Sequence, residues 1–377
     1  MYSALLLTLP ILLIVAVILL IVRTHDLTSK QIVGLILTAV IAVILIVTVL
    51  VPVLDSSDDA RTDNTVHYDD YIQSTATSAD GSLELITIDG VQYAHAVGVG
   101  SGTLTYSDGT VATIDVQKAY LDVFLIMGQS NSAYFHAEAD LADPTPTLGT
   151  AYFYGVEGHP LFTSNDTCEA ITDYDAYFTG CGMYSMNASD GLVKTGNFET
   201  PFSARWHDLT GHKVYSINTG VTAMPIQGLQ PGEYGYNYAQ QMVIRAMAAV
   251  DTSHYEVSFV SCIWAQGEGN AAMTESTYKS NFLTIYHSLR GDSFLFSDVY
   301  TIEDMIIIQT NAEYAANPAQ AQAELARDYA HIIMGTTISQ TFTIANGMLA
   351  DDGVHYTQLA DNKIGVELAD TYFKVKG

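Results

Sequence analysis

The stretch Val123–Asn131, which reads VFLIMGQSN, decides the fold. Its first five residues form a continuous apolar run, which is typical of a parallel strand that helices cover on both faces. The run stops at Gly128, and Ser130 follows at the point where a strand would turn into a helix. Ligand sites in open parallel sheets lie beyond the carboxyl ends of the strands, so the residues after each strand are the candidates for chemistry.

The rest of the C-terminal sequence continues this pattern. Further strands are expected at residues 214–217, 257–263 and 305–308, and helices at 238–250, 275–289, 318–334 and 357–374. Strands that alternate with helices of this length predict βαβ crossovers and a doubly wound sheet. We therefore expect an α/β domain over residues 119–377, in which the Tyr-, Gly-, Asp- and Asn-rich segment 150–210 forms loops over the edge of the sheet.

Residues 81–118 follow a different pattern, with short alternating segments that are separated by Asp-Gly pairs. Asp89-Gly90 separates two such segments, and Asp108-Gly109 separates the next two. An Asp-Gly pair in this position is a strong hairpin signal, because a type I′ turn needs positive φ at both central residues. The pattern predicts a small β module after an acidic linker at 55–80, with a role as a spacer favoured over glycan binding.

Two uncharged apolar runs, at residues 4–22 and 32–54, precede the linker. Each meets the length of about 20 residues that a membrane-spanning helix requires. The first run fits a cleaved signal peptide less well, because it lacks a basic start and is followed by Arg23-Thr24-His25-Asp26 instead of small residues. Arg23 and Lys30 place the connector in the cytoplasm under the positive-inside rule. We expect a transmembrane hairpin at 1–54, contact with the lipid bilayer and an extracellular α/β domain.

The composition excludes some partners and cofactors. With 14 Lys and Arg against 41 Asp and Glu, the formal net charge is −27, which argues against binding to the phosphates of nucleic acids. Cys168 and Cys181 could close one loop, and Cys262 has the setting of a small core residue. The segment His136–Asp140 (HAEAD) has no metal-binding spacing, so neither a metal nor another cofactor is expected.

Three short segments after predicted strands, or near the C-terminus, carry residues that could perform chemistry. Ser130 could present its hydroxyl near the N–H groups of a following helix, Gln266 could donate an amide N–H, and Asp352 lies three residues before His355. Each signal alone has a simpler explanation, a helix cap for the serine and a surface pair for Asp352 and His355. A shared position at the strand ends of one sheet favours a common site.

Together, Ile126–Asn131, Trp264–Glu268 and Asp352–His355 resemble the conserved blocks of the sialate O-acetylesterase-like branch of SGNH hydrolases. The acetyl xylan esterases of carbohydrate esterase family six are related to this branch. The blocks occur in the order of the family and cover the chain from about Leu121 to the C-terminus. The resemblance implies a three-layer α/β/α SGNH (flavodoxin-like) fold with a parallel sheet.

The resemblance also implies a role for individual residues. Ser130 would be the nucleophile, His355 the general base and Asp352 the partner that orients it. The oxyanion hole would consist of the Ser130 backbone N–H, a glycine best matched by Gly220, and the Gln266 side chain.

Other positions in the blocks would support this site or depart from the family pattern. Gln129, Asn131 and Glu268 would hold the site residues in place. Val221 stands where the family often has a second glycine, and Ser132 stands where a methionine is frequent. Asp351 fits the spacing to the histidine less well than its neighbour.

The function implied is that of a serine esterase that removes O-acetyl groups from carbohydrates through an acetyl-serine intermediate. Its substrate would be an acetylated glycan or another small acetyl ester. One alternative is a catalytically weak surface adhesin or glycan-binding protein on the same fold. Another is a lipid-directed esterase, although an apolar lip would suit it better than the polar segment 150–210.

Overall fold

The computed structural model describes residues 65–133, 141–156, 159–160, 171, 173–186, 196–291, 294–295 and 300–376. These residues belong to one compact unit that begins at Thr65. The spans expected at 4–22 and 32–54 lie outside the described residues. Within the described ranges, no helix is both long enough and apolar enough to cross a membrane.

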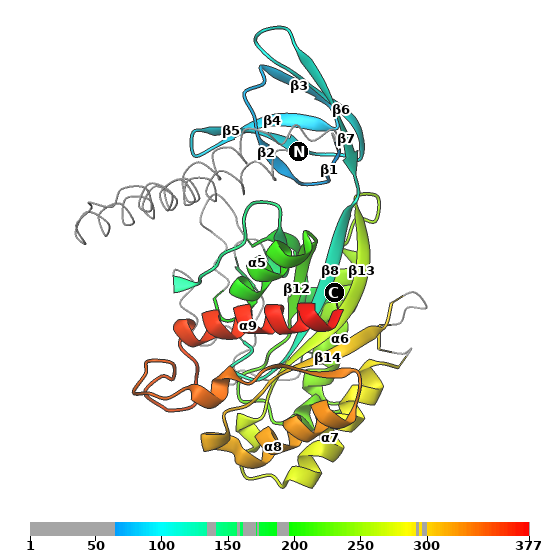
Figure 1. Cartoon of the computed structure of the whole chain (residues 1–377). Helices are drawn as coiled ribbons and strands as arrows, with labels where there is room; N and C mark the ends of the chain where they lie inside the picture. Colours follow the sequence, from blue (N-terminus) through cyan, green and yellow to red (C-terminus); the bar gives the residue numbers. More distant parts are fainter. Residues whose placement is uncertain are drawn as a thin grey trace, which may run out of the picture. The chain divides into compact units, whose positions relative to one another are not determined.

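The α/β domain is built on a mainly parallel sheet with the strand order β10-β9-β12-β8-β13-β14-β15 (Figure 1). Strands β10 and β11 pair antiparallel with β9, and the remaining neighbours are parallel. The expected parallel sheet is thereby confirmed. The strands are β8 (Ala119–Gly128), β9 (Ala151–Val156), β10 (His159–Pro160), β11 (Gly182–Ser185), β12 (Lys213–Asn218), β13 (Tyr255–Ala265), β14 (Ile302–Ile308) and β15 (Ile332–Thr336).

Helices cover both faces of the sheet, so the sheet has two separate apolar cores. In β8, Leu121 and Val123 pack into the core under α6, α7 and α8, whereas Phe124 packs into the core under α5 and α9. This explains why the strand is apolar at nearly every position. The helices are α4 (Tyr174–Tyr177), α5 (Glu199–Thr210), α6 (Tyr234–Ala248), α7 (Glu275–Leu289), α8 (Ala312–Asp328) and α9 (Gln358–Lys376), with 3₁₀ turns at Ile226–Leu229, Glu268–Asn270 and Ile338–Thr341.

The β module consists of two small sheets with strand orders β1-β7-β6-β3 and β2-β5-β4. The hairpin between β4 and β5 turns at Asp89-Gly90, where φ is 50° and 79° as a type I′ turn requires. A small core of its own includes Leu83, Leu104 and Val116. The strands are β1 (Thr65–His67), β2 (Tyr71–Gln73), β3 (Ser78–Gly81), β4 (Leu83–Ile88), β5 (Val91–Ala96), β6 (Gly100–Thr105) and β7 (Val111–Gln117).

Three sequence-based expectations about the fold are corrected. The acidic linker does not extend to residue 80, because β1, β2 and β3 lie in residues 65–81. The segment 150–210 contains β9, whose first five residues are buried, and α5, which buries Phe202 and Trp206. The aromatic residues of β9 and α5 belong to the hydrophobic core. Because polar residues surround them in the sequence, the composition of the segment does not indicate this.

The third correction concerns the helix expected at 318–334. Helix α8 runs from Ala312 to Asp328 with Pro318 inside it, and residues 332–336 form the edge strand β15. Ile332, Ile333 and Met334 continue an apolar pattern without an intervening glycine or proline, so the end of the helix is not marked in the sequence.

A polar network joins the β module to the α/β domain. Lys213 at the start of β12 is 3% exposed, and its Nζ donates to Asp70 Oδ1 (2.9 Å), Asp69 O (3.2 Å) and Gly149 O (2.5 Å). The Tyr152 hydroxyl donates to the Asp69 carboxylate. Only Lys118 separates β7 from β8, and Figure 1 shows one strand leading into the other. The network and this short connection join the module directly to the domain.

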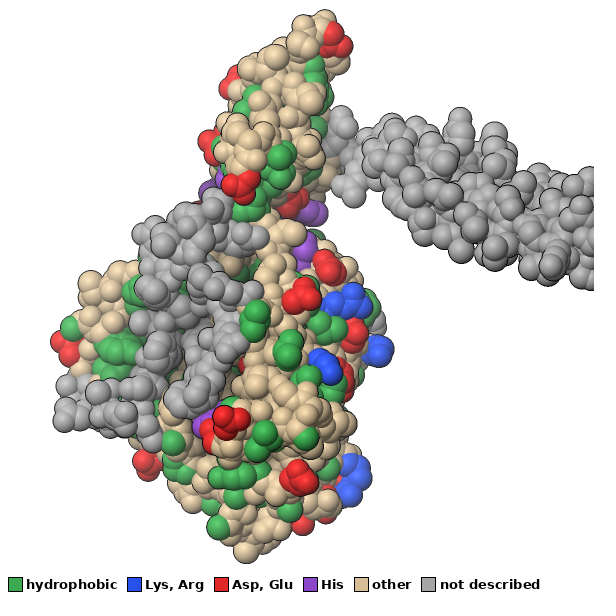
Figure 2. All heavy atoms as spheres, turned by 90° about the vertical axis from the view of Figure 1, so that its left-hand side faces the viewer, with side chains coloured by type: hydrophobic (Ala, Val, Ile, Leu, Met, Phe, Trp, Pro, Cys, Tyr) green, Lys and Arg blue, Asp and Glu red, His purple; other side chains and the backbone are tan. Residues whose placement is uncertain are grey.

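The surface is predominantly acidic in the part that the structure describes. On the face shown in Figure 2, acidic side chains are scattered, whereas Lys and Arg occur at few positions. Residues 65–117 contain seven Asp and Glu and neither Lys nor Arg. Polyanionic partners would therefore meet electrostatic repulsion over much of this surface.

Candidate active site

The predicted site residues meet at the carboxyl edge of the sheet. Ser130 follows β8, Gly220 follows β12 and Gln266 follows β13, so three neighbouring parallel strands deliver their next residues to the same edge. His355 comes from the loop that precedes α9. Gly128 allows the close approach, because a Cβ there would lie 2.1 Å from the Ala265 carbonyl oxygen.

Ser130, His355 and Asp352 form a continuous hydrogen-bonded chain. The Ser130 Oγ lies 2.9 Å from His355 Nε2, and His355 Nδ1 lies 2.6 Å from Asp352 Oδ2. This is the arrangement in which a carboxylate fixes the imidazole tautomer with a proton on Nδ1 and leaves Nε2 to accept a proton from the hydroxyl. The chain joins residues that are 225 positions apart in the sequence.

A tight turn holds Asp352 in this chain. The backbone N–H groups of Val354 and His355 both donate to Asp352 Oδ1, at 2.9 and 3.0 Å, and Gly353 adopts a φ of 72° between them. Burial acts to raise the pKa of Asp352, but the hydrogen bonds from the His355 side chain and from the two N–H groups outweigh it and lower the pKa to about 2. The carboxylate that contacts His355 is thus ionised at neutral pH.

Asn131 connects the serine segment to the histidine loop. Its Nδ2 donates to Glu268 Oε1 (3.1 Å) and to the Val354 carbonyl (3.2 Å), and its Oδ1 accepts the Tyr356 N–H (3.3 Å). Burial raises the pKa of Glu268, against the opposing effects of Asn131, Tyr356 and the charge of His355. Asn131 and Glu268 therefore hold the histidine loop against the serine segment, as their place in the sequence blocks implies.

The structure places the Gln266 side chain in a buried amide network. Its Nε2 donates to Asn270 Oδ1 at 2.5 Å and lies 3.3 Å from Gln129 Oε1, and its Oε1 accepts the Tyr278 hydroxyl at 3.1 Å. The side chain has no exposed surface. The Gly269 N–H also donates to Gln129 Oε1, at 2.9 Å, which identifies that atom as the oxygen of the amide. Gln266 thereby orients the side chain of the residue that immediately precedes Ser130.

Gly220 packs closely against the serine segment. A Cβ at this position would lie 2.5 Å from Ser132 Oγ and 2.7 Å from the Ala133 nitrogen. The Gly220 N–H donates to Asn218 Oδ1 at 3.0 Å, so this donor is engaged within the turn. A role in an oxyanion hole would require the N–H to change its partner when substrate binds. Val221, the departure from the family pattern, is fully buried.

Sequence reasoning missed residues that hold this edge together. Asn218 and Asn197 both donate through Nδ2 to the Ser132 carbonyl, at 2.8 and 3.0 Å, and Asn270 receives the Gln266 amide. The position of Asn218 at the end of a predicted strand was the available signal. Nothing in the sequence distinguished Asn197, which lies in the segment assigned to loops.

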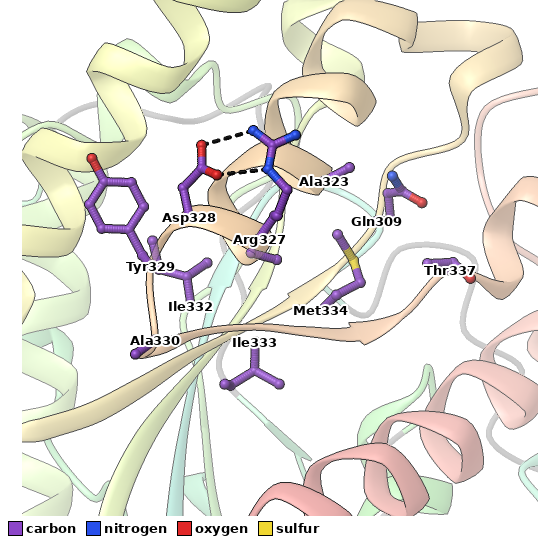
Figure 3. Close-up of a pocket in the computed structure, with 11 residues that line it drawn as sticks. Gln309, Ala323, Arg327, Asp328, Tyr329, Ala330, Ile332, Ile333, Met334 and Thr337 are labelled. Atoms are coloured by element: carbon purple, nitrogen blue, oxygen red, sulfur yellow. Dashed lines mark hydrogen bonds and ion pairs between the residues drawn. The ribbon is translucent and has the colours of Figure 1, made fainter.

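Other candidate features lie apart from this site. A hollow of about 640 Å³ runs along β15, where Arg327 and Asp328 are paired beside Met334 (Figure 3), and none of the triad residues lines it. The part of the chain that the structure describes has no group of three or more His, Cys, Asp or Glu that could hold a metal, and residues 136–140 lie outside it. Cys262 is buried in β13 as expected, Cys181 is a free thiol, and Cys168 is not among the described residues.

The α/β/α layers and the Ser–His–Asp chain at the carboxyl edge define the class as hydrolases of the SGNH type. Residues 188–374 match the family "Carbohydrate esterase, sialic acid-specific acetylesterase". Over this segment the α/β domain is similar to that family of carbohydrate esterases. The matched segment contains Asp352 and His355 but begins after Ser130, so the hydrogen bond from Ser130 to His355 is what links the serine to the matched part.

Several solved structures show distant similarity to this chain. A carbohydrate acetylesterase from Xanthomonas citri has 14% identity and a TM-score of 0.43, with 83% of this chain and 73% of that protein covered. A protein from Arabidopsis thaliana has 14% identity and a TM-score of 0.42, with 68% and 98% covered. A variant of an acetyl xylan esterase from Geobacillus stearothermophilus has 12% identity and a TM-score of 0.32, with 69% and 94% covered. No curated protein matches the sequence significantly.

Proposed function

We propose that this protein is a membrane-anchored, extracellular-facing serine esterase that removes O-acetyl groups from carbohydrates. The observation that carries the proposal is the chain from Ser130 Oγ through His355 to Asp352, with contacts of 2.9 and 2.6 Å. The similarity of residues 188–374 to a family of carbohydrate esterases supports a sugar ester as the substrate.

The geometry supports an acyl-transfer mechanism in two steps. Ser130 Oγ attacks the acetyl carbonyl carbon while His355 Nε2 takes the hydroxyl proton, and Asp352 stabilises the imidazolium that forms. The tetrahedral intermediate collapses to acetyl-serine, and the sugar oxygen leaves with the proton from His355. Water then attacks the acetyl-serine with His355 again as the base, and acetate and free Ser130 result.

The oxyanion is the charge that the rest of the site must stabilise. The Ser130 backbone N–H is the first donor in the proposal, and the Gln266 amide would be the second after its Nε2 releases Gln129 Oε1. Gly220 would join them only after its N–H releases Asn218 Oδ1.

The apolar runs at 4–22 and 32–54 support the anchoring part of the proposal, since each is long enough to span a bilayer. The test is protease treatment of intact cells. Degradation of the α/β domain by external protease, with both runs retained in the membrane fraction, is the expected result. Protection of the domain until the cells are lysed would overturn the extracellular orientation.

The activity test compares p-nitrophenyl acetate with p-nitrophenyl octanoate, using the full-length protein in detergent. The expected result is preferential cleavage of acetate and a loss of about 10⁴–10⁶-fold in kcat in Ser130→Ala. Ser276→Ala, an exposed serine on α7, is the matched control. Preference for octanoate would favour a lipid-directed esterase, and a folded protein inactive on both esters would favour the adhesin alternative.

A further inference from the structure

The β module contains a hollow of about 680 Å³ between the end of β2, the β4–β5 turn and the residue after β6. The hollow is open to solvent, so a long ligand could lie across it. Its polar lining residues are Gln73, Ser74, Thr75, Gln92 and Tyr106. We call this hollow the module groove.

The module groove is lined entirely by uncharged residues. This is unusual in its surroundings, because residues 65–117 carry seven acidic side chains and no basic one. An anionic ligand would find no counter-charge in the groove and would be repelled by the acidic residues around it. The chemistry of the groove therefore suits a neutral ligand that makes hydrogen bonds.

Gln92 lines the groove, and its amide is fixed by two hydrogen bonds. Its Nε2 donates to the Ala76 carbonyl at 2.7 Å and to the Ser74 carbonyl at 3.2 Å, and these two bonds use both amide hydrogens. Ser74 Oγ accepts the Ala76 N–H at 3.2 Å, which leaves its hydroxyl proton available as a donor. The groove thus offers a fixed acceptor, Gln92 Oε1, beside hydroxyl donors.

Tyr106 adds an aromatic surface to these polar groups. Its ring is half-buried against the core of the module, which fixes the ring in place. A held aromatic ring with a polar tip, next to paired donors and acceptors, suits a ligand that has apolar C–H faces and many hydroxyl groups.

We propose that the module groove binds a neutral, hydroxyl-rich glycan chain, so that the β module is an accessory carbohydrate-binding site and more than a spacer. The link to catalysis rests on the function proposed above, whereas the binding itself does not. The glycan would be the uncharged polysaccharide whose acetyl esters the triad cleaves, held by a stretch of sugar units remote from the ester.

The joint connects this second site directly to the esterase domain. The buried Lys213 and the single residue between β7 and β8 prevent the module from swinging freely. A polymer bound at both sites gains effective concentration at the triad only if one chain can reach both. Polymeric substrates should therefore benefit from the module, and small acetyl esters should not.

The first experiment measures binding without turnover. Full-length protein in detergent, carrying Ser130→Ala, is titrated with acetylated xylan, acetylated glucomannan and polysialic acid. We expect binding to at least one neutral polymer and none to polysialic acid. Gln73→Ala combined with Tyr106→Phe should weaken that binding about tenfold, since two hydrogen-bonding groups are lost and the ring is kept. Thr113→Ala, an exposed residue of β7 outside the groove, is the control.

The second experiment uses the protein with Ser130 intact and measures the ratio of kcat/KM on the bound acetylated polymer to kcat/KM on p-nitrophenyl acetate. We expect the groove double variant to lower this ratio about tenfold, through KM for the polymer. Absence of binding to every neutral polymer, binding that the double variant does not weaken, or preferential binding of polysialic acid would each overturn the inference. If p-nitrophenyl acetate is not hydrolysed at all, the proposed function fails while the binding result still decides the role of the groove.

Discussion

The two halves of the candidate site are built in different ways. Asp352 and His355 lie three residues apart in one partly exposed turn, and backbone N–H groups of that turn hold the carboxylate. Gln129 and Gln266, by contrast, follow different strands and are buried, and they contact each other although 137 positions separate them in the sequence. The triad half, Asp352 and His355, is thus formed within one turn. The amide half, Gln129 and Gln266, depends on how the strand ends pack against each other.

This difference predicts how mutations in each half behave. A side-chain substitution in the turn of Asp352 and His355 should preserve the fold of the turn. Such a change should therefore lower kcat and leave the stability of the protein intact. A buried network leaves an unsatisfied partner when one member is removed, so changes there should affect both.

In the triad half, Asp352→Asn should have a smaller effect than loss of Ser130 or His355 but a larger one than any change in the amide half. An amide cannot hold the tautomer with a proton on Nδ1, so kcat should fall by about 10³–10⁴ with little change in Tm. Steady-state kinetics on p-nitrophenyl acetate and thermal unfolding measure the two quantities. Asp351→Asn, the adjacent exposed carboxylate, is the control, and equal losses in both variants would contradict the assignment of Asp352.

In the amide half, we expect Gln266→Ala and Gln129→Ala each to lower kcat by about 10²–10³, the usual effect of losing one oxyanion donor. Because Gln266 orients Gln129, the double variant should lose little more than either single variant. A double-mutant cycle on kcat with parallel unfolding curves measures this coupling. Additive losses would show that the two amides act independently, and a near-normal kcat in Gln266→Ala would remove that residue from the oxyanion site.

Gly220→Ala tests the packing of the same half. The added Cβ would meet Ser132 Oγ and the Ala133 backbone nitrogen, which cannot both move aside, so we expect destabilisation of about 1–3 kcal/mol. Chemical denaturation measures this change in the free energy of unfolding. Gly98→Ala is the control, since the nearest atom to its Cβ would be 3.9 Å away. Equal stability of both variants would contradict the close contact.

The smallest effect concerns Glu268 between the two halves. Its folded-state pKa is raised chiefly by burial, so the folded protein holds this proton more tightly than the unfolded chain does. The associated stability is present below the unfolded pKa, about 4.3, and is lost as the pH rises through the folded pKa. Glu268→Gln should therefore gain stability relative to the wild type as the pH rises from 4 to 8. Urea denaturation at both pH values measures this, and a constant difference would contradict it.

Much of the fold follows from the sequence because the central strands are continuous apolar runs and the segments between them have the length of helices. Helix α7 was predicted at the residues that it occupies, 275–289. The edges of the sheet were harder to predict. Strands β9 and β15 are short, and their identity depends on the neighbours with which they pair, which local patterns do not encode.

The site follows the same division. The grouping of Ser130, Asp352 and His355 was predictable from three short blocks and their order. The engagement of the Gly220 N–H by Asn218, and of the Gln266 amide by Asn270, was not, because these local bonds depend on the exact backbone conformation of the turns after β12 and β13. A resemblance identifies which residue stands at a position but not which partner its donors have.

The buried Lys213 sets the smallest piece of this protein that can stand alone. A fragment that begins at residue 119 would remove Asp69 and Asp70 and leave the ammonium with the Gly149 carbonyl, at 2.5 Å, as its remaining bond from the joint. The Tyr152 hydroxyl would also lose Asp69, so polar groups that are paired across the joint would have to be solvated again. We accordingly expect the module and the esterase domain to be inherited together, and we expect a truncation at their boundary to give a less stable protein.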